Sequence, residues 1–289
     1  MLEHRDGALP FLVVSTNRCA ARLTPYGAQV CEWAPAGQAT SVVFLSPHAI
    51  FAAGRAIRGG VPVCFPWFAN HPSDPAKPAH GFARTRTWEI GDVNRDAAGA
   101  IRVVLRLASD EATRALWNAD FSATLTISLG TSLAMTFEAE NRSAADITYE
   151  IALHTYPAVS DVEKVRGYGL ERTRFLDKVD GMREKVSGDE PLTCAGEMDR
   201  VFLDTTATCV VDDPVLRRRI RVEKTNSRAT VVWTPGREKG PAVPDLGEAW
   251  RRFVCVETAN CGPRAVRLAP RERHAMTAVI SCTERPQDS

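Results

Sequence analysis

Alternation of apolar and polar residues, the pattern of a half-buried β-strand, recurs along this chain. It is clearest in 124–129 and 133–140, which flank the turn residues Gly130-Thr131 and predict a β-hairpin. Asn141-Arg142-Ser143 predicts another turn, after which 147–156 is expected to continue as the third strand of an antiparallel meander. Further short strands are predicted in four segments: 102–107, 220–224, 229–233 and 253–257.

Helical signals are persuasive in one short segment. Ser109 is expected to cap a helix over 110–117, where Asp110 and Glu111 lie in the first turn and favour the helix dipole. The chain contains no internal repeat, low-complexity tract or Gly/Ser linker. Many short strands without interleaved helices therefore predict an all-β, antiparallel sandwich with few short helices and argue against a parallel α/β sheet.

Composition and charge narrow the function classes. The chain has 289 residues, of which 44% are hydrophobic and 25% charged, as in soluble globular proteins with one large domain or two ordinary ones. A net charge of +1 provides no field to hold nucleic acid or an anionic membrane. No stretch approaches the roughly 20 apolar residues of a membrane span, and the first residues lack the features of a secretory signal. We therefore expect a cytoplasmic monomer with a small-molecule partner.

The cysteines and histidines do not follow metal-site or disulfide patterns. Eight cysteines are scattered without a CxxC motif, and several, such as Cys64 and Cys255, lie in apolar runs. A free thiol in such a run behaves as a small hydrophobe, so reduced cytoplasmic thiols are expected. The histidines show no ligand spacing. We expect no metal and no cofactor.

Residues 57–89 have the most distinctive composition in the chain. Three arginines (Arg58, Arg84 and Arg86) and two histidines lie among glycines, prolines and aromatic residues, which excludes a long helix or a regular strand. Guanidinium groups on a proline-braced loop suit an oxyanion, because each presents paired donors and stays charged. Composition alone is equally compatible with a solvated surface loop.

Two motifs in this loop, IRGGVPVCFPWF and PAHGFAR, resemble the signature of the hexose-6-phosphate mutarotases (glucose-6-phosphate 1-epimerases), a branch of the aldose 1-epimerase superfamily. The resemblance continues in order through five more segments: 152–170, 176–178, 197–204, 231–239 and 251–260. It implies a galactose-mutarotase-like sandwich forming one domain over 1–289. It also implies an epimerase that interconverts the anomers of a hexose 6-phosphate, with glucose 6-phosphate as the leading candidate and no cofactor.

His154 is the candidate general acid. Strand alternation places Ile151 and Leu153 on one face and His154, with Ala152, on the opposite and more polar one. A histidine in a strand is more often structural than catalytic. The resemblance aligns His154 with the catalytic histidine of the family, and so implies that it protonates the ring oxygen of the sugar.

Glu257 is the candidate general base. It ends the apolar run 253–256, which predicts a central strand covered on both faces. A carboxylate in that place must be paired or have a raised pKa, and both conditions suit a base. The alternative is a glutamate that emerges into solvent at a strand end. The resemblance aligns Glu257 with the family's base, which removes the proton of the anomeric hydroxyl.

The resemblance also implies four substrate-binding residues. Arg58 and Arg84 align with arginines that contact the phosphate, and Arg86 either assists them or is an edge-strand charge. Asp199 aligns with a residue that hydrogen-bonds sugar hydroxyls, although a turn aspartate is the commoner interpretation. His80, the first residue of HGFAR, is the fourth.

The chain departs from the family pattern at two positions in the loop. Ala79 stands where some members have a substrate-contacting glutamine, and Trp67 also replaces a glutamine. These departures leave the sugar preference open.

Two alternative functions remain on the sequence alone. One is an epimerase of unphosphorylated aldoses, against which the paired arginines argue because a neutral sugar offers them no anion. The other is a non-catalytic carbohydrate-binding protein with the same fold, since fold alone does not establish activity. The presence of both His154 and Glu257 argues against it.

Overall fold

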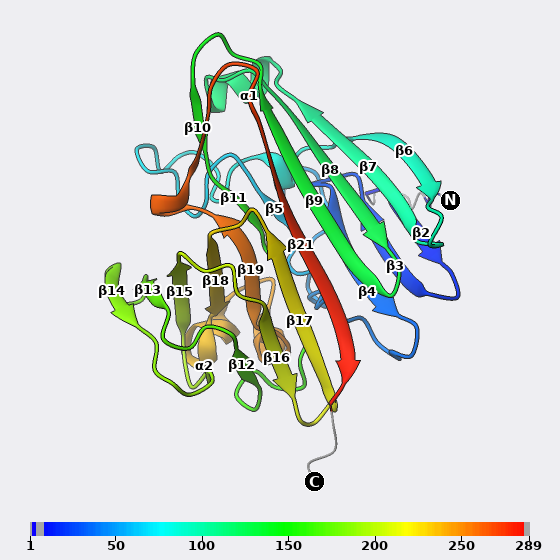
Figure 1. The fold of residues 1–289 in the computed structure, drawn as a ribbon, viewed down its shortest axis with the longest axis vertical. Helices are drawn as coiled ribbons and strands as arrows, with labels where there is room; N and C mark the ends of the chain where they lie inside the picture. Colours follow the sequence, from blue (N-terminus) through cyan, green and yellow to red (C-terminus); the bar gives the residue numbers. More distant parts are fainter. Residues whose placement is uncertain (1, 4–8, 286–289) are drawn as a thin grey trace.

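Two large antiparallel sheets packed face to face form the body of the protein (Figure 1). The computed structural model describes residues 2–3 and 9–285. Strands predominate and the helices are short, which confirms the predicted all-β sandwich.

One layer is an eight-stranded sheet that contains the longest strands of the fold. Its strands, in spatial order, are β12 (Arg166–Tyr168), β16 (Cys209–Asp213), β17 (Arg218–Thr225), β21 (Arg273–Glu284), β9 (Ser132–Asn141), β8 (Phe121–Leu129), β7 (Ile101–Ala108) and β6 (Glu89–Arg95). The β8–β9 hairpin turns at the predicted Gly130-Thr131.

The other layer is a seven-stranded sheet of shorter strands. Its strands, in spatial order, are β14 (Arg183–Val186), β13 (Arg174–Asp177), β15 (Met198–Leu203), β18 (Ala229–Thr234), β19 (Cys255–Asn260), β11 (Ile151–Leu153) and β5 (Val63–Cys64). The strand predicted at 253–257 is β19, which lies inside this sheet between β18 and β11.

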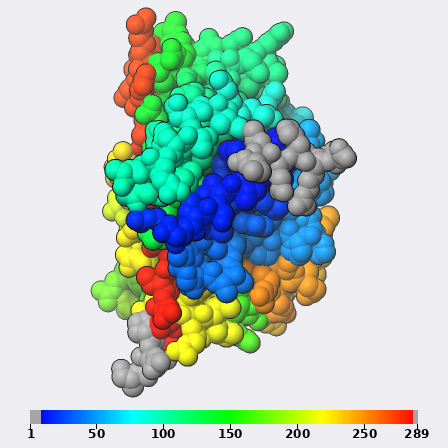
Figure 2. All heavy atoms as spheres, turned by 90° about the vertical axis from the view of Figure 1, so that its right-hand side faces the viewer, coloured from blue at the N-terminus to red at the C-terminus, as the bar shows by residue number. Residues whose placement is uncertain are grey.

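Two smaller sheets and a few helical turns complete the fold. The N-terminal sheet consists of β1 (Leu2–Glu3), β2 (Phe11–Ser15), β3 (Cys19–Thr24) and β4 (Gln29–Pro35). The other small sheet is a two-stranded ribbon of β10 (Ile147–Tyr149) and β20 (Val266–Leu268). The helical segments are α1 (Glu111–Leu116), α2 (Gly236–Lys239) and the 3₁₀ turns Ala83–Thr85, Gly240–Ala242, Gly247–Arg252 and Gly262–Arg264. Figure 2 shows the N-terminal strands (blue) lying against the teal segment that contains β6 and β7.

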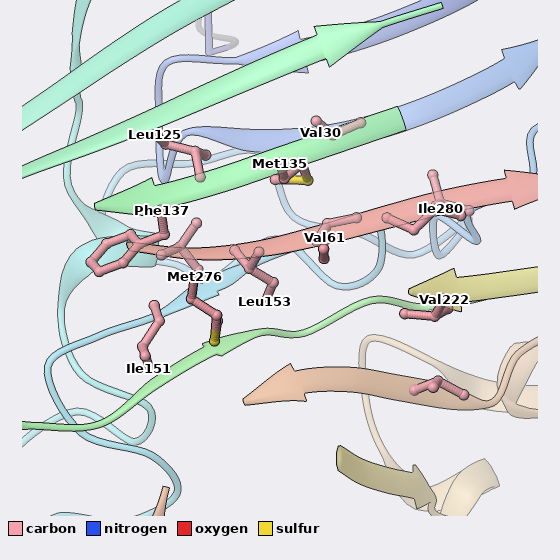
Figure 3. Packing of buried hydrophobic residues seen from close by; sticks show 14 of the residues in the cluster. Val30, Val61, Leu125, Met135, Phe137, Ile151, Leu153, Val222, Met276 and Ile280 are labelled. Atoms are coloured by element: carbon pink, nitrogen blue, oxygen red, sulfur yellow. The ribbon is translucent and has the colours of Figure 1, made fainter. Parts of the chain in front are cut away.

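The sequence alternation becomes the burial pattern of the sandwich. In β8 and β9 every second side chain is buried, because successive residues of a strand point to opposite faces. Figure 3 shows how Leu125 and Phe137 from these strands and Ile280 from β21 pack towards Ile151 and Leu153 of the opposing sheet. The apolar positions predicted from periodicity thus form the core between the two sheets.

The predicted meander strand over 147–156 is wrong in its pairing. The chain instead forms β10, which pairs with β20, and then β11, which pairs with β19 and β5. The other neighbour of β9 is β21, from the far end of the sequence. Alternation determines which face a residue takes, but it does not specify the partner strand, so the change of sheet near Glu150 left no signal in the local pattern.

The predicted helix is present with a different cap. Asp110, rather than Ser109, caps α1, since its carboxylate accepts a hydrogen bond from the Thr113 N–H while Thr113 Oγ1 accepts one from the Asp110 N–H. Ser109 Oγ instead lies 3.0 Å from Asp120 Oδ1. Within residues 2–3 and 9–285, no helix is both long and apolar enough to cross a membrane.

Candidate active site

All six residues that were predicted to form the site line one cavity of about 290 Å³. They are Arg58, His80, Arg84, His154, Asp199 and Glu257. Four residues that were not proposed as site residues line it with them: Phe68, Ala79, Lys178 and Trp233. Segments far apart in the sequence therefore meet in a single polar pocket.

The register of the seven-stranded sheet aims three of these side chains into the cavity. Asp199 of β15 is paired with Trp233 of β18, and Val231 of β18 is paired with Glu257 of β19. Paired residues of antiparallel strands share a face, as do residues two positions apart. Val256, next to Glu257, points the other way into the main core. The sheet face opposite the core is thus the floor of the cavity.

His154 follows β11 and continues its alternation. Leu153 packs in the main core, whereas Ala152 belongs to a separate apolar cluster under the cavity. The His154 N–H donates to the carbonyl of Pro62 at 2.9 Å. The imidazole stacks on the Tyr156 ring, with centroids 4.8 Å apart and an interplanar angle of 15°. Backbone and ring contacts together hold the imidazole in one orientation.

His154 and Glu257 form a buried acid–base pair. His154 Nε2 and Glu257 Oε1 lie 3.3 Å apart, and the side chains are 7% and 1% exposed. Burial raises the pKa of Glu257 well above its usual value, and the charge of Asp199 adds to this effect. Burial also lowers the pKa of His154, with smaller contributions from His80 and Arg84. Both shifts favour the state in which Glu257 holds a proton and His154 is neutral.

This pair leaves capacity for a ligand. Within the part of the chain that the structure describes, neither His154 Nδ1 nor Glu257 Oε2 hydrogen-bonds to another residue. Buried polar atoms are normally satisfied, and exceptions concentrate where a ligand or catalytic function requires them. The free carboxylate oxygen of Glu257 can therefore accept a hydrogen bond from a bound hydroxyl.

Glu257→Gln is expected to gain stability relative to the wild type as pH rises. The folded state raises the pKa of Glu257 above the unfolded value near 4.5. Its favourable contribution is therefore complete below that pH and is lost as pH rises through the folded pKa. Glutamine carries no charge and escapes this loss. Since one pKa unit is about 1.4 kcal/mol, the melting temperature of the variant should gain about 2 °C or more on the wild type between about pH 5 and about pH 9.

Differential scanning calorimetry of both proteins across this pH range checks the expectation. A difference in melting temperature that stays constant with pH would show that Glu257 is ionised to the same extent in the folded and unfolded states.

His80 is a neutral hydrogen-bond donor. The ring Nδ1 of His80 accepts a hydrogen bond from the Ala69 backbone N–H at 3.3 Å. The backbone N–H of His80 donates to the Ala69 carbonyl at 2.6 Å. Burial and then the charge of Arg84 lower the pKa of His80. Because Nδ1 is an acceptor, the proton of the neutral ring is on Nε2. The ring centroid lies 5.6 Å from that of His154, so this N–H is close to the acid–base pair.

Arg84 is the unneutralised cation of the cavity. Its Nη2 donates to the carbonyl of Ala79 at 2.8 Å. None of the described carboxylates forms an ion pair with it. A guanidinium has five N–H donors, so most of its donors remain for an anionic ligand. Arg86, in contrast, does not line the cavity and lies near Asp110 at the start of α1.

Arg58 is oriented by two partners. Its Nε lies 3.1 Å from Asp245 Oδ1, and its Nη1 donates to the Tyr156 hydroxyl at 3.2 Å. Because Tyr156 stacks on His154, Arg58 belongs to the same end of the cavity as the histidine. Gly60 permits this path, since a Cβ there would lie 2.1 Å from the Val30 carbonyl oxygen.

The two departures from the family pattern have different surroundings. Ala79 lines the cavity, and its carbonyl accepts a hydrogen bond from Arg84 Nη2. Trp67 does not line it: the side chain is buried, and its Nε1–H donates to the Pro78 carbonyl at 2.9 Å. Trp67 therefore stabilises the loop, and Ala79 is the departure that bears on the ligand.

Sequence reasoning missed Lys178 and Trp233 as site residues. Lys178 Nζ lies 2.8 Å from Asp199 Oδ2, and Trp233 lies edge-on to His154 with centroids 6.2 Å apart. Both occur in segments that carry the family resemblance, and Trp233 follows Val231 in strand alternation. Those two signals together could have identified them. Among the described residues, no group of three or more His, Cys, Asp or Glu side chains could hold a metal ion.

Comparisons with known proteins identify a matching family and similar chains. The model of the aldose 1-epimerase family matches residues 11–281. The "Putative glucose-6-phosphate 1-epimerase" of Escherichia coli is 36% identical over 252 residues, which cover 87% of this chain and 83% of that protein.

Solved structures extend the likeness to the fold. The crystal structure of "a putative mutarotase" from Salmonella typhimurium has 31% identity and a TM-score of 0.90, and the match covers 98% of this chain and 93% of that one. A galactose mutarotase related enzyme from Lactobacillus acidophilus has 13% identity and a TM-score of 0.76, with 96% and 99% of the two chains covered. This second likeness confirms the predicted galactose-mutarotase-like form of the sandwich.

Proposed function

This chain belongs to the aldose 1-epimerase family and is a mutarotase, and from this premise we propose that it interconverts the α and β anomers of a hexose 6-phosphate, specifically glucose 6-phosphate. One observation carries the proposal. The same cavity contains the buried His154–Glu257 pair and an arginine, Arg84, that has no carboxylate partner among the described residues. A sugar with an anionic group matches both features, and a neutral sugar matches only the first.

The acid–base pair performs ring opening. Glu257 removes the proton of the hydroxyl on C1 while His154 delivers a proton to the ring oxygen O5. The C1–O5 bond breaks, its electron pair stays on O5, and C1 becomes an aldehyde carbon. Glu257 is then protonated and His154 neutral. Positioned groups of this kind each contribute about 10²–10⁴-fold in rate.

Ring closure reverses the two roles. Rotation about the C1–C2 bond presents the other face of the aldehyde to O5. His154 takes back the proton of the O5 hydroxyl, and Glu257 returns its proton to O1. The protein ends in its starting protonation state, so the cycle has no net demand for protons or electrons. Burial favours the state in which Glu257 holds the proton and His154 is neutral, so ring opening begins once that proton has moved to His154 across their 3.3 Å contact.

The remaining side chains of the cavity hold the sugar. Arg84 and Arg58 bind the phosphate, whose oxygens accept charge-assisted hydrogen bonds. The neutral His80 donates its Nε2 proton to an oxygen near the anomeric centre. Asp199 accepts hydrogen bonds from sugar hydroxyls, and the Trp233 ring contacts the apolar face of the sugar. Each role matches the charge or shape that the cavity offers at that point.

The protein is expected to accelerate anomer exchange of glucose 6-phosphate at least about tenfold more, in kcat/KM, than that of glucose. The reason is the charge-assisted bonds to Arg84 and Arg58, each worth about 1.5–3 kcal/mol. Exchange NMR of the anomeric protons of each sugar, with and without the protein, measures both rates.

Two results would contradict the proposal in different ways. Equal acceleration of the two sugars would mean an aldose epimerase without phosphate preference. Exchange at the uncatalysed rate for both sugars, together with sugar binding in calorimetry, would mean a non-catalytic carbohydrate-binding protein.

A further inference from the structure

Lys178 is a cavity residue whose role the acid–base chemistry leaves open. It directly follows β13, and its N–H donates to the Asp199 carbonyl at 2.9 Å. Its Nζ lies 2.8 Å from Asp199 Oδ2 and 5.3 Å from the centroid of the Phe68 ring. The side chains of Lys178 and Asp199 remain 24% and 20% exposed, and both line the cavity. Backbone and side-chain bonds thus hold an ammonium and a carboxylate side by side at the cavity wall.

The functional groups follow the order of the strands across the cavity floor. His154 follows β11, Glu257 is on β19, and these strands are neighbours. Asp199 is on β15, two strands beyond β19, a distance of about 10 Å at the usual strand spacing. Lys178 follows β13, one strand further. The Lys178–Asp199 pair is therefore at the opposite end of the row from His154.

Arg58 is at the histidine end of this row, and Arg84 lies near both members of the acid–base pair. Arg58 donates to the hydroxyl of Tyr156, whose ring stacks on His154. The charges of Arg84 and Arg58 act on His154, and those of Lys178 and Arg84 act on Glu257, so of these three cations Arg58 acts on the histidine alone and Lys178 on the glutamate alone. The cavity thus has an anion-binding end, an acid–base pair beside it, and a lysine–aspartate pair at the far end.

A hexose 6-phosphate can be placed in this row by its connectivity. The phosphate-bearing C6 is attached to C5, which is bonded to O5, and O5 is bonded to C1. With the phosphate at the arginines, O5 at His154 and O1 at Glu257, the next ring atoms away from the phosphate are C2 and C3. C4 returns towards C5 and the arginine end. The hydroxyls on C2 and C3 therefore face the far end of the cavity.

On the basis of the proposed function, we propose that Lys178 and Asp199 together recognise the neighbouring hydroxyls on C2 and C3 of the sugar. Asp199, nearer Glu257, accepts from the C2 hydroxyl, and Lys178 donates to the C3 hydroxyl. A hydroxyl is both donor and acceptor, so a lysine–aspartate pair can satisfy two adjacent hydroxyls, which a carboxylate alone cannot.

This assignment makes Lys178 a specificity-determining residue. When an analogue that lacks one of these hydroxyls binds, the partly buried lysine–aspartate pair is left with an unsatisfied hydrogen-bonding group. Sites of this type reject such analogues strongly. The alternative is that Lys178 only compensates the charge of Asp199. In that case its removal would affect every phosphosugar equally, because the change would act through Asp199 and the pKa of Glu257.

Hydroxyl recognition and charge compensation by Lys178 are distinguished by removing first the lysine and then the C3 hydroxyl of the sugar. Lys178→Met keeps an unbranched side chain that is one atom shorter, and it removes the charge and the donors. The variant and the wild type are compared by exchange NMR on glucose 6-phosphate and 3-deoxyglucose 6-phosphate. We expect Lys178→Met to lower kcat/KM for glucose 6-phosphate about tenfold or more, mainly through KM. For the 3-deoxy sugar the two proteins should agree within about threefold, because the hydroxyl that Lys178 binds is already absent.

Lys185→Met provides the matched control. Lys185 is on β14 of the same hairpin, and it pairs with Asp177 and Asp180 outside the cavity. This variant should match the wild type on both sugars. An undiminished penalty of Lys178→Met on 3-deoxyglucose 6-phosphate would overturn the assignment and leave Lys178 as a charge partner of Asp199. A wild type that accelerates neither phosphosugar would overturn the proposed function itself.

Discussion

Replacement of His154 by alanine or of Glu257 by glutamine is expected to lower kcat for glucose 6-phosphate by about 10²–10⁴-fold. Each change removes one of the two groups that must exchange protons with O5 and O1. The two side chains lie 3.3 Å apart, and ring opening needs one proton removed at O1 and another delivered to O5, so neither works without the other. The double variant should therefore be little worse than either single one, as for residues that act as a unit. Exchange NMR at saturating substrate measures kcat for the three variants.

Matched substitutions outside the cavity provide the controls. His71→Ala removes a histidine from the same loop as His80, and Glu223→Gln neutralises a glutamate of β17 that pairs with Arg221. Both variants should retain wild-type kcat. Turnover close to that of the wild type in His154→Ala or Glu257→Gln, with unchanged sugar binding, would show that the acid and base have been assigned to the wrong residues.

Arg84→Ala is expected to raise KM for glucose 6-phosphate about tenfold to a hundredfold while kcat changes little. The lost contact is a charge-assisted hydrogen bond, worth about 1.5–3 kcal/mol. The phosphate is remote from C1, so the contact is equally strong in the ground state and the transition state. Such a contact affects KM rather than kcat. Activity on free glucose should be unaffected by the substitution.

Arg86→Ala is the control for this variant. Arg86 lies two residues along the chain but outside the cavity, near Asp110. Inorganic phosphate should compete with the substrate in the wild type, and the competition should weaken in Arg84→Ala. If Arg84→Ala abolished kcat on glucose and glucose 6-phosphate alike, the arginine would be structural or catalytic rather than a phosphate ligand.

Arg84 is a more informative target than Arg58 because of their surroundings. Arg58 is tied to Asp245 and Tyr156, and Tyr156 in turn supports the His154 ring. Its removal would disturb the orientation of the catalytic imidazole as well as phosphate binding. Arg84 donates a hydrogen bond to the Ala79 carbonyl and forms no ion pair with a described carboxylate, so its loss changes fewer groups. The sequence motif does not distinguish the two arginines, whereas the structure shows that they have different partners.

Much of the sandwich follows from local pattern. The alternation in β8 and β9, the turn at Gly130-Thr131 and the short helix α1 were all predictable, because strand and turn signals depend on residues close in sequence. The face taken by His154 was predictable for the same reason. The identity of the acid and base came from family resemblance, since periodicity specifies a direction for a side chain but not its chemistry.

Tertiary structure decided which of these side chains meet. Asp245, which orients Arg58, lies 187 residues away in the sequence. β10 and β11 follow β9 in the sequence but pair with β20 and β19, which lie far away in the chain. Lys178 and Asp199 became a pair only through the pairing of β13 with β15. Contacts between distant segments determine which strands pair. They also determine the burial of Glu257 and the pKa shifts that this burial causes. Local sequence determines the elements and their faces, and only the assembled sheets determine the site.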